Sequence, residues 1–166
     1  ALSDNTTGAE NTAFGLCALS ANTTGEHNVA VGRTAMVANT TGDFNVAVGN
    51  YSLDANTDGD HNVAVGYCSL GANTEGDTNT AFGFQSMECN TTGDKNTGIG
   101  TYALSSNTTA DDNVAIGQSS MTSSTTGASN TAVGRLSLLS NTTGVANIAL
   151  GYAAGGVYTT SACNIS

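Results

Sequence analysis

A short alternation of polar and apolar residues recurs along the whole chain. Asn45-Val46-Ala47-Val48-Gly49 is one copy, and most copies read Asn, Thr or Val, Ala, a large apolar residue, Gly. A period of two predicts a β-strand, because successive side chains of a strand point to opposite faces. A shorter apolar pair such as Ala18-Leu19 follows in each unit, and Gly and Asn-Thr-Thr-Gly separate the two pieces. Each unit therefore reads as turn, strand, turn, strand, since glycine adopts positive φ without steric cost.

The copies recur every 17 residues without an insertion or a deletion. We number the unit from its Asn-Thr-Thr-Gly turn, so that position 1 is Asn5, position 2 is Thr6, position 7 is Asn11 and position 11 is Gly15. Every copy that reaches them has Thr at position 2, Asn at position 7 and Gly at position 11. The units begin at residues 5, 22, 39, 56, 73, 90, 107, 124, 141 and 158.

Self-similarity at a fixed period of this kind is typical of solenoid architectures. We predict an all-β fold, a single β-solenoid over residues 1–166 with 17 residues per coil and about nine and a half coils. Helices are a poor alternative, because Gly and β-branched residues recur too often and no helical spacing of apolar residues persists through a unit. Coils stacked at about 4.8 Å would form a rod of roughly 45 Å, with equivalent residues lying above one another.

The alternation also assigns each row of side chains to a face. Positions 8 and 10, as in Val46 and Val48, are expected to form the core together with position 15, as in Leu53. Position 9 is nearly always Ala and shares the opposite face with Asn and Gly. We expect this small-residue face to be a seam between chains, or alternatively the inner wall of a very flat coil. The Asn row at position 7 is expected to hydrogen-bond its side-chain amides from coil to coil.

Charge and composition narrow the functional classes. The formal net charge is −10, and only Arg33, Lys95 and Arg135 are positive. Binding to a phosphate backbone requires clustered Lys and Arg, so nucleic acid is not an expected partner. No run of 18 apolar residues is present, so membrane insertion is not expected. With 5% aromatic residues, the chain has too little bulk for a wide core, which favours a thin, repetitive one.

Units such as Asn28-Val29-Ala30-Val31-Gly32, followed by Ala35-Met36, resemble the head repeats of trimeric autotransporter adhesins with YadA-like, haemagglutinin-type repeats. They are also similar to the Asn-Thr-Thr-Gly repeats of phage tail-fibre proteins. The resemblance covers essentially the whole chain. It implies a left-handed parallel β-roll, three chains around one axis, and a place at a cell or virion surface. The familiar adhesin unit is shorter, and here the Asn-Thr-Thr-Gly turn lengthens each coil.

An acidic row occupies position 5 in six consecutive units. Neighbouring like charges stacked at about 4.8 Å in water repel by roughly 0.9 kcal/mol, and a cation would relieve this repulsion. Four carboxylates from two coils are expected to converge, and Ca²⁺ prefers such oxygen ligands. A calcium site is one hypothesis and a solvated turn is the simpler interpretation; no other cofactor is expected. The candidate ligands are Asp58, Asp60, Glu75 and Asp77.

Positions 12 and 13 are the most variable of the unit. They carry Tyr, Phe and Arg, which are enriched at protein interfaces. This stripe is expected either to recognise a partner, such as a surface receptor or a glycan, or to pack neighbouring chains together. The stripe consists of Arg33, Tyr51, Tyr67, Phe84, Tyr102, Arg135 and Tyr152.

No catalytic constellation emerges from the repeat. His27 and His61 share position 6 without a nucleophile and an orienting carboxylate repeated beside them, as a triad requires. Cys17 and Cys68 lie roughly 14 Å apart by the coil spacing, which is too far for a disulfide. The spacing of the cysteines matches no zinc motif. We therefore expect a protein that is not an enzyme.

The Asn-Thr-Thr turn also matches the acceptor pattern for N-glycosylation. Six tripeptides fit it, as do Asn50 and Asn164. Because the tripeptide is part of the repeat, the match arises whether or not the chain is glycosylated.

Three functions are compatible with the sequence. The first is an extracellular structural or adhesive rod, the head segment of a fibre or adhesin, assembled as a homotrimer. The second is a subunit of a self-assembling extracellular filament, because the sequence begins and ends within a unit and neither end carries a capping repeat. The third is ice binding through the Thr residues of positions 2 and 3, which form a regular hydroxyl array.

Overall fold

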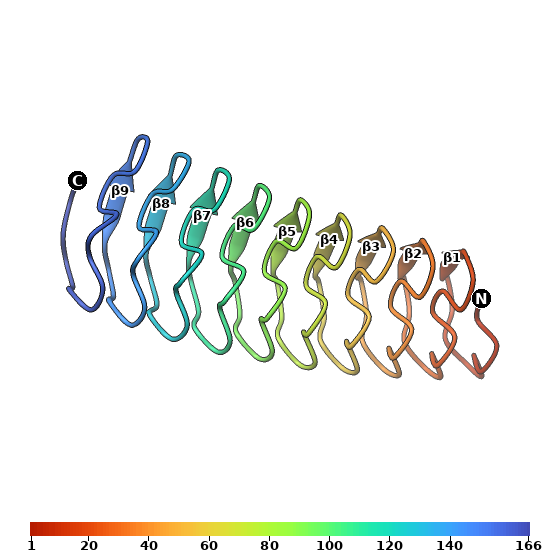
Figure 1. Ribbon diagram of the computed structural model, residues 1–166. Coiled ribbons are helices and arrows are strands. Elements are labelled where there is room, and N and C mark those ends of the chain that lie inside the picture. The colour runs from red at the N-terminus through yellow and green to blue at the C-terminus, as the bar shows by residue number, and fades with distance from the viewer.

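The computed structural model describes residues 1–166 and contains nine short strands in one parallel sheet. Each strand pairs in register with the strand of the next unit, so that Val46 lies opposite Val63 and Ala47 opposite Ala64. Figure 1 shows the resulting rod, in which one ribbon winds through stacked coils and the two termini lie at opposite ends. The strands are β1 (Thr12–Phe14), β2 (Val29–Val31), β3 (Val46–Val48), β4 (Val63–Val65), β5 (Thr80–Phe82), β6 (Thr97–Ile99), β7 (Val114–Ile116), β8 (Thr131–Val133) and β9 (Ile148–Leu150).

The predicted all-β solenoid is confirmed. Every strand covers positions 8 to 10 of its unit, and eight turns of 17 residues separate the first strand from the ninth. Partial coils extend the rod at both ends, and Ile165 forms a further parallel bridge with Ile148. One continuous apolar cluster runs through the coils from Ala18 to Ala149. The chain has no helix that is long and apolar enough to cross a membrane.

The core consists of two main facing rows, at positions 9 and 15, and a third buried row of Ala and Ser at position 14. Position 9 contributes Ala, as in Ala64, and position 15 contributes Leu or Met, as in Leu70; both side chains are fully buried. The prediction for position 15 is confirmed, whereas the prediction that positions 8 and 10 form the core is wrong: Val63 is half-buried and Val48 is exposed. In so flat a coil only a methyl group fits opposite the Leu row, so branched side chains point outward. The small-residue face is the inner wall of a flat coil and not a seam between chains.

Gly98 shows how closely the two rows are packed. It replaces the usual Ala in β6, and a Cβ atom at this position would lie 2.7 Å from Cγ of Met87. The longer, flexible Met side chain therefore occupies the volume that the missing methyl group leaves, as Met commonly does in irregular cores.

We expect Ala64→Val to destabilise the protein by about 1–3 kcal/mol, because added methyl groups on the inner wall overpack the core. Val63→Thr is the matched control on the neighbouring residue, which faces outward and is Thr in other coils such as at Thr80. Denaturant unfolding of both variants measures the difference. Equal losses for the two substitutions would contradict the assignment of faces.

A row of buried Asn residues at position 1 joins the coils on one side. Nδ2 of Asn39 donates to Oδ1 of Asn22 in the preceding coil, at 2.9 Å. It also donates to the carbonyl of Gly42, at 3.1 Å, and so closes its own Asn-Thr-Thr-Gly turn. Each side chain thus stabilises a local turn and the stacking of two coils at once.

A second buried Asn row, at position 7, meets the first. Nδ2 of Asn28 donates to the carbonyl of Gly42 in the next coil at 2.8 Å, and its Oδ1 accepts the backbone N–H of Asn45 at 2.9 Å. The Gly42 carbonyl therefore receives an amide from each row. Side-chain amides at position 7 bond to one another in four pairs, beginning with Asn96 and Asn79 at 3.3 Å. The predicted bonding between side-chain amides at position 7 is thus found in part of the row, and position 1 forms a second, longer amide ladder that runs from Asn5 to Asn107.

The position 1 ladder is interrupted once within the rod. Ser124 stands where the other complete units have Asn, and it is fully buried. Its Oγ has no hydrogen-bond partner in the protein, and Oδ1 of Asn107, which would accept from an Asn at position 124, has none either. Nδ2 of Asn141 donates only to the carbonyl of Gly144. Oδ1 of Asn141 is also unpaired, because position 1 of the next unit is Tyr158. Because unpaired buried polar atoms are costly, this coil is a weak point of the rod.

We expect Ser124→Asn to raise the free energy of unfolding by about 1 kcal/mol, since the new Nδ2 would donate to Asn107 and the new Oδ1 would accept from Asn141. The adjacent Ser123→Asn substitution is the control and should be nearly neutral. Thermal or urea unfolding compares the two. A Ser124→Asn variant no more stable than the control would refute this account of the ladder.

The turns hold three non-glycine residues per coil at positive φ. In one coil these are positions 6, 13 and 15, as in His61 (58°), Tyr51 (60°) and Leu53 (51°). Such a conformation costs about 1–2 kcal/mol for a residue with a side chain. Position 11 requires Gly in addition, because a Cβ at Gly83 (φ 136°) would lie 2.7 Å from the carbonyl of Gly100. The repeated inter-coil hydrogen bonds compensate for this strain and keep the side chains of position 13 at the surface.

Candidate interaction surface

Exposed apolar side chains gather on the outer face of the sheet. Position 10 forms a continuous row there, and its most exposed members are Phe14 (76%), Phe82 (55%) and Leu150 (72%). Position 8 adds a parallel row of Thr, Val and Ile, so that the face has two rows of side chains on each strand. We call this surface, formed by positions 8 and 10 of β1 to β9, the outer sheet face.

Charge is sharply segregated around the coil. All 13 acidic residues occupy positions 3, 5, 6, 16 and 17, and none lies between positions 7 and 15. Arg33 and Arg135, two of the three cationic residues, both occupy position 12 beside the outer sheet face. A chain with a net charge of −10 thus has one long face without a carboxylate.

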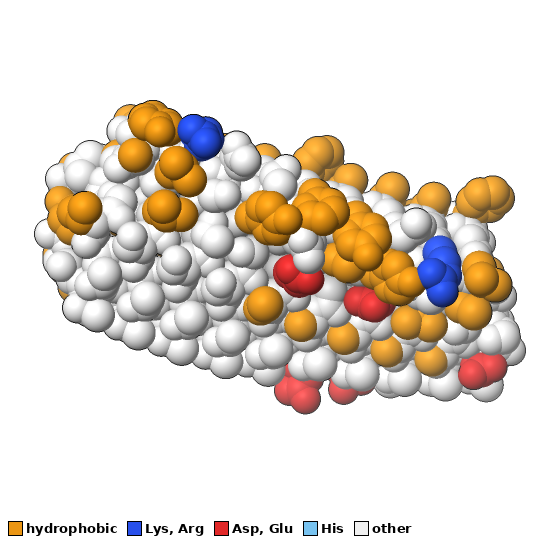
Figure 2. Space-filling view, in the orientation of Figure 1, with side chains coloured by type: hydrophobic (Ala, Val, Ile, Leu, Met, Phe, Trp, Pro, Cys, Tyr) orange, Lys and Arg blue, Asp and Glu red, His pale blue; other side chains and the backbone are white.

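Five residues of the predicted stripe form one contiguous row of contacts. The guanidinium of Arg33 lies 5.3 Å from the ring centroid of Tyr51. The ring of Tyr51 meets Tyr67 edge to face at 5.7 Å, Tyr67 stacks on Phe84 at 5.4 Å, and Phe84 meets Tyr102 edge to face at 5.5 Å. We call the four rings the aromatic ladder. Figure 2 shows an orange band along the rod that ends at a blue cationic side chain.

The other two stripe residues form a separate pair toward the C-terminus. The guanidinium of Arg135 lies 5.6 Å from the ring centroid of Tyr152, and its Nε donates to Oε1 of Gln118 at 3.2 Å. The variable positions 12 and 13 therefore bring most of the predicted residues together, in two groups. The sequence could not reveal that rings from two different positions of the repeat join in one ladder.

A hollow of about 340 Å³ lies directly beside the aromatic ladder. It arises because position 16 is Gly71, between Asp54 in the preceding coil and Glu88 in the following coil. Figure 2 shows two acidic side chains just below the orange band. We call this feature the Gly71 hollow; its lining residues are Asp54, Cys68, Gly71, Ala72, Glu88 and Cys89.

Burial alters the titration of groups around the Gly71 hollow. Burial raises the pKa of Asp54 above its usual value of 3.8, and a backbone hydrogen bond opposes this rise in part. Burial also raises the pKa of the Cys68 thiol, and the carboxylates of Asp54 and Glu88 add to the effect. The pKa of Cys89 is raised for the same reasons, by burial and by Glu88. All four cysteines of the chain are free thiols.

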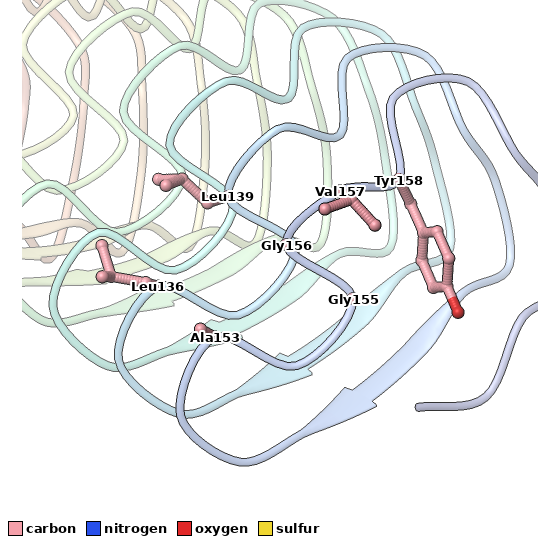
Figure 3. A pocket seen from close by; sticks show the side chains of 7 residues that line it. All are labelled: Leu136, Leu139, Ala153, Gly155, Gly156, Val157 and Tyr158. Carbon is pink, nitrogen blue, oxygen red and sulfur yellow. The ribbon is translucent and has the colours of Figure 1, made fainter.

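A second, apolar hollow of about 400 Å³ lies near the C-terminus. Figure 3 shows Leu136 and Leu139 from one turn, with Val157 and Tyr158 from the next. Gly155 stands here in place of the Leu or Met of position 15, and a Cβ atom on it would lie 3.1 Å from Cδ2 of Tyr158. The tyrosine ring therefore covers the end of the core row.

The acidic row at position 5 has a structural explanation. Oδ1 of Asp60 accepts the backbone N–H of Asp43 at 2.7 Å, and Oδ1 of Asp77 accepts the N–H of Asp60 at 2.8 Å. Equivalent bonds involve Glu26, Asp94 and Asp111. Each aspartate of the row, from Asp43 to Asp111, thus accepts a backbone N–H group of the preceding coil, and Glu26 takes part only as a backbone donor.

The four candidate calcium ligands are not brought together as a metal site. No group of three or more His, Cys, Asp and Glu side chains is placed to hold a metal ion. Asp60 and Asp77 accept backbone N–H groups, and Asp58 accepts the hydroxyl of Thr41 at 2.7 Å. The side chain of Glu75 is exposed. The calcium site therefore stays a prediction from the sequence alone.

The two histidines and the Thr residues of position 2 make contacts within the rod. His27 and His61 stack on either side of Phe44, at 4.6 and 5.1 Å between ring centroids. At position 2 the hydroxyl of Thr40 donates to the carbonyl of Thr57 at 3.1 Å, and most other coils repeat this bond. These hydroxyl donors are used within the rod, and Asp and Glu interrupt the exposed Thr row of position 3 in two coils. Ice binding stays a prediction.

Most of the glycosylation motifs are inaccessible. A sugar can be attached only to an exposed Asn side chain, and among the six Asn-Thr-Thr tripeptides only that of Asn5 begins with one. Asn50, which begins another motif, is exposed as well. The fully buried acceptors are Asn22, Asn39, Asn90, Asn107 and Asn141.

Comparison with known proteins gives no match to a family model, to a curated protein or to a solved structure.

We expect Asp54→Asn to stabilise the protein at pH 7. Burial raises the folded-state pKa of Asp54, so its charged form lowers stability at neutral pH. This penalty diminishes as the pH falls through the raised pKa and is absent at a pH well below about 4, where the carboxyl is protonated in both states. Urea unfolding at pH 7, 5 and 3, with Glu75→Gln as the control, measures the effect. A stabilisation that is the same at every pH would contradict it.

Proposed function

We propose that this chain is an extracellular structural rod, the head segment of a surface fibre or adhesin, and that it packs against copies of itself. The observation that carries the proposal is the segregation of charge: the outer sheet face is apolar and free of carboxylates, although the net charge of the chain is −10. Two strongly acidic copies repel each other elsewhere on their surfaces. They can approach closely only where neither presents an acidic group.

The shape of the outer sheet face also supports self-association. Its two rows run along all nine strands, so a second rod aligned with the first meets the same side chains at every coil. Exposed apolar patches of this continuity are uncommon on monomeric proteins and mark interaction sites. Three copies around one axis, as the resemblance to trimeric adhesin heads implies, would cover the face and leave the acidic turns in solvent.

A rigid rod of stacked coils suits a mechanical role at a cell or virion surface. Its coils are joined by backbone hydrogen bonds on several sides, for example Val46 to Asn62 at 2.8 Å and Gly49 to Val31 at 2.8 Å. A force that pulls along the axis would be shared among all the hydrogen bonds that join two adjacent coils. Attachment to a partner would then fall to the variable side chains of positions 12 and 13.

We expect the wild-type chain to sediment as a trimer, with three times the mass of one chain. Phe82→Glu combined with Ile99→Glu should produce a monomer, because two buried carboxylates per copy would face one another across the interface. Thr92→Glu combined with Thr109→Glu places the same charges on exposed turn residues and should leave the trimer intact. Sedimentation velocity measures the masses, and circular dichroism confirms that each variant is folded.

A wild-type chain that sediments as a monomer at micromolar concentration would refute self-packing through this face. A distribution of ever larger species without a plateau would instead favour the filament.

A further inference from the structure

The chain already shows how its stripe holds a guanidinium group. Arg33 lies over the ring of Tyr51 and also hydrogen-bonds its hydroxyl, and Arg135 lies over the ring of Tyr152. A planar guanidinium stacks on aromatic rings and pairs with carboxylates through a fork of N–H donors. The same contact therefore forms twice within the chain, at the two ends of the variable stripe.

The other three rings of the aromatic ladder have no arginine beside them. Tyr67, Phe84 and Tyr102 are all exposed, at 45%, 42% and 39%, and no cationic side chain of the chain contacts them. Asp54 and Glu88 flank this part of the ladder, two coils and therefore roughly 10 Å apart. Neither carboxylate has an ion-pair partner, since the one ion pair in the structure joins His27 and Glu10.

We propose that the Gly71 hollow, together with the aromatic ladder, binds an arginine side chain of a basic partner polypeptide. The guanidinium would enter the hollow between Asp54 and Glu88 and pack beside the ring of Tyr67. This inference rests on the proposed function, because it names the chemistry of the partner to which the rod attaches.

Charge complementarity identifies this occupant. The hollow has two carboxylates, and its lining residue Cys68 lies next to Tyr67 of the aromatic ladder. In a chain with a net charge of −10, an anion or a second acidic surface is therefore disfavoured as the occupant. The hollow is also not arranged to hold a metal ion, since no group of three or more suitable ligands meets there. A flat organic cation satisfies the carboxylates and the rings together.

Gly71 controls access to the hollow. Its φ is not in the positive range, and a Cβ atom there would make only ordinary contacts, 3.4 Å from Oδ1 of Asp54. Leu139 occupies the same position of the repeat four coils further on. Gly71→Leu can therefore fill the hollow without altering charge or backbone.

The test is a titration of the intact chain with three peptides, acetyl-Gly-Arg-Gly-Arg-Gly-amide and its lysine and citrulline analogues, at physiological salt. Citrulline preserves the shape of arginine and removes its charge. We expect the arginine peptide to bind, the lysine peptide to bind severalfold more weakly, and the citrulline peptide not to bind. Nuclear magnetic resonance shifts of residues around Gly71 report the site, and calorimetry reports the affinity.

Three variants decide the outcome. Gly71→Leu and the double variant Asp54→Asn/Glu88→Gln should each weaken binding by about tenfold or more. Glu75→Gln/Asp112→Asn removes two carboxylates from exposed turns and should change the affinity less than about twofold, because surface charges away from the site contribute little. Equal weakening by both double variants would mean that net charge alone attracts the peptide, and it would overturn the proposal.

Two further results separate this inference from the proposed function. Loss of the trimer in Asp54→Asn/Glu88→Gln would show that an arginine of a second copy fills the hollow, which overturns a foreign partner. A monomeric wild-type chain that still binds the arginine peptide through the Gly71 hollow would refute self-packing and support this inference.

Discussion

The rod depends on the pairing of buried carboxamide groups between adjacent coils. Each coil is too thin to exclude water with apolar side chains alone, since its core is one Leu or Met packed against two small side chains, the Ala of position 9 and the Ala or Ser of position 14. Two rows of buried Asn side chains hold the coils together in addition to the apolar core. Both rows donate to the carbonyl of the position 4 residue, such as Gly42. A buried amide network of this kind specifies one arrangement only when nearly all of its members are satisfied. The strict repetition of Asn and Gly in the sequence follows from that requirement.

The same network explains the backbone strain. The residues at positions 6, 13 and 15 adopt positive φ although they are not glycine. The intrinsic preference of such residues disfavours this conformation. The hydrogen bonds of the neighbouring coils impose this shape on every turn in the same way. Because each coil serves as a template for the next, a residue such as Tyr51 can adopt a strained backbone and still present its ring at the surface.

The sequence predicted the architecture well, because a fixed period of 17 residues allows little besides a solenoid. It failed on the direction of side chains. Alternation shows that Val46 and Ala47 face opposite sides, but not which side is inside, and hydrophobicity alone favoured the larger residue. The coil is too thin for the larger residue, so Ala47 faces the interior and Val46 faces outward. The sequence likewise indicates only mutual repulsion among the position 5 carboxylates. In the structure, Asp60 and Asp77 accept backbone N–H groups of the preceding coil. Contacts between residues at different positions of the repeat, such as Tyr51 with Tyr67, could not be predicted by comparing equivalent positions from coil to coil.

The exact register of the repeat has a consequence for how such a chain can evolve. Insertion of one residue would displace Ala47, Asn45 and every equivalent residue beyond the insertion from their rows. Gain or loss of a whole unit, by contrast, preserves all rows and changes the length of the rod by about 4.8 Å. Recombination between repeats can therefore change the length of the rod in discrete steps, while positions 12 and 13 accept many different residues without disturbing the buried rows.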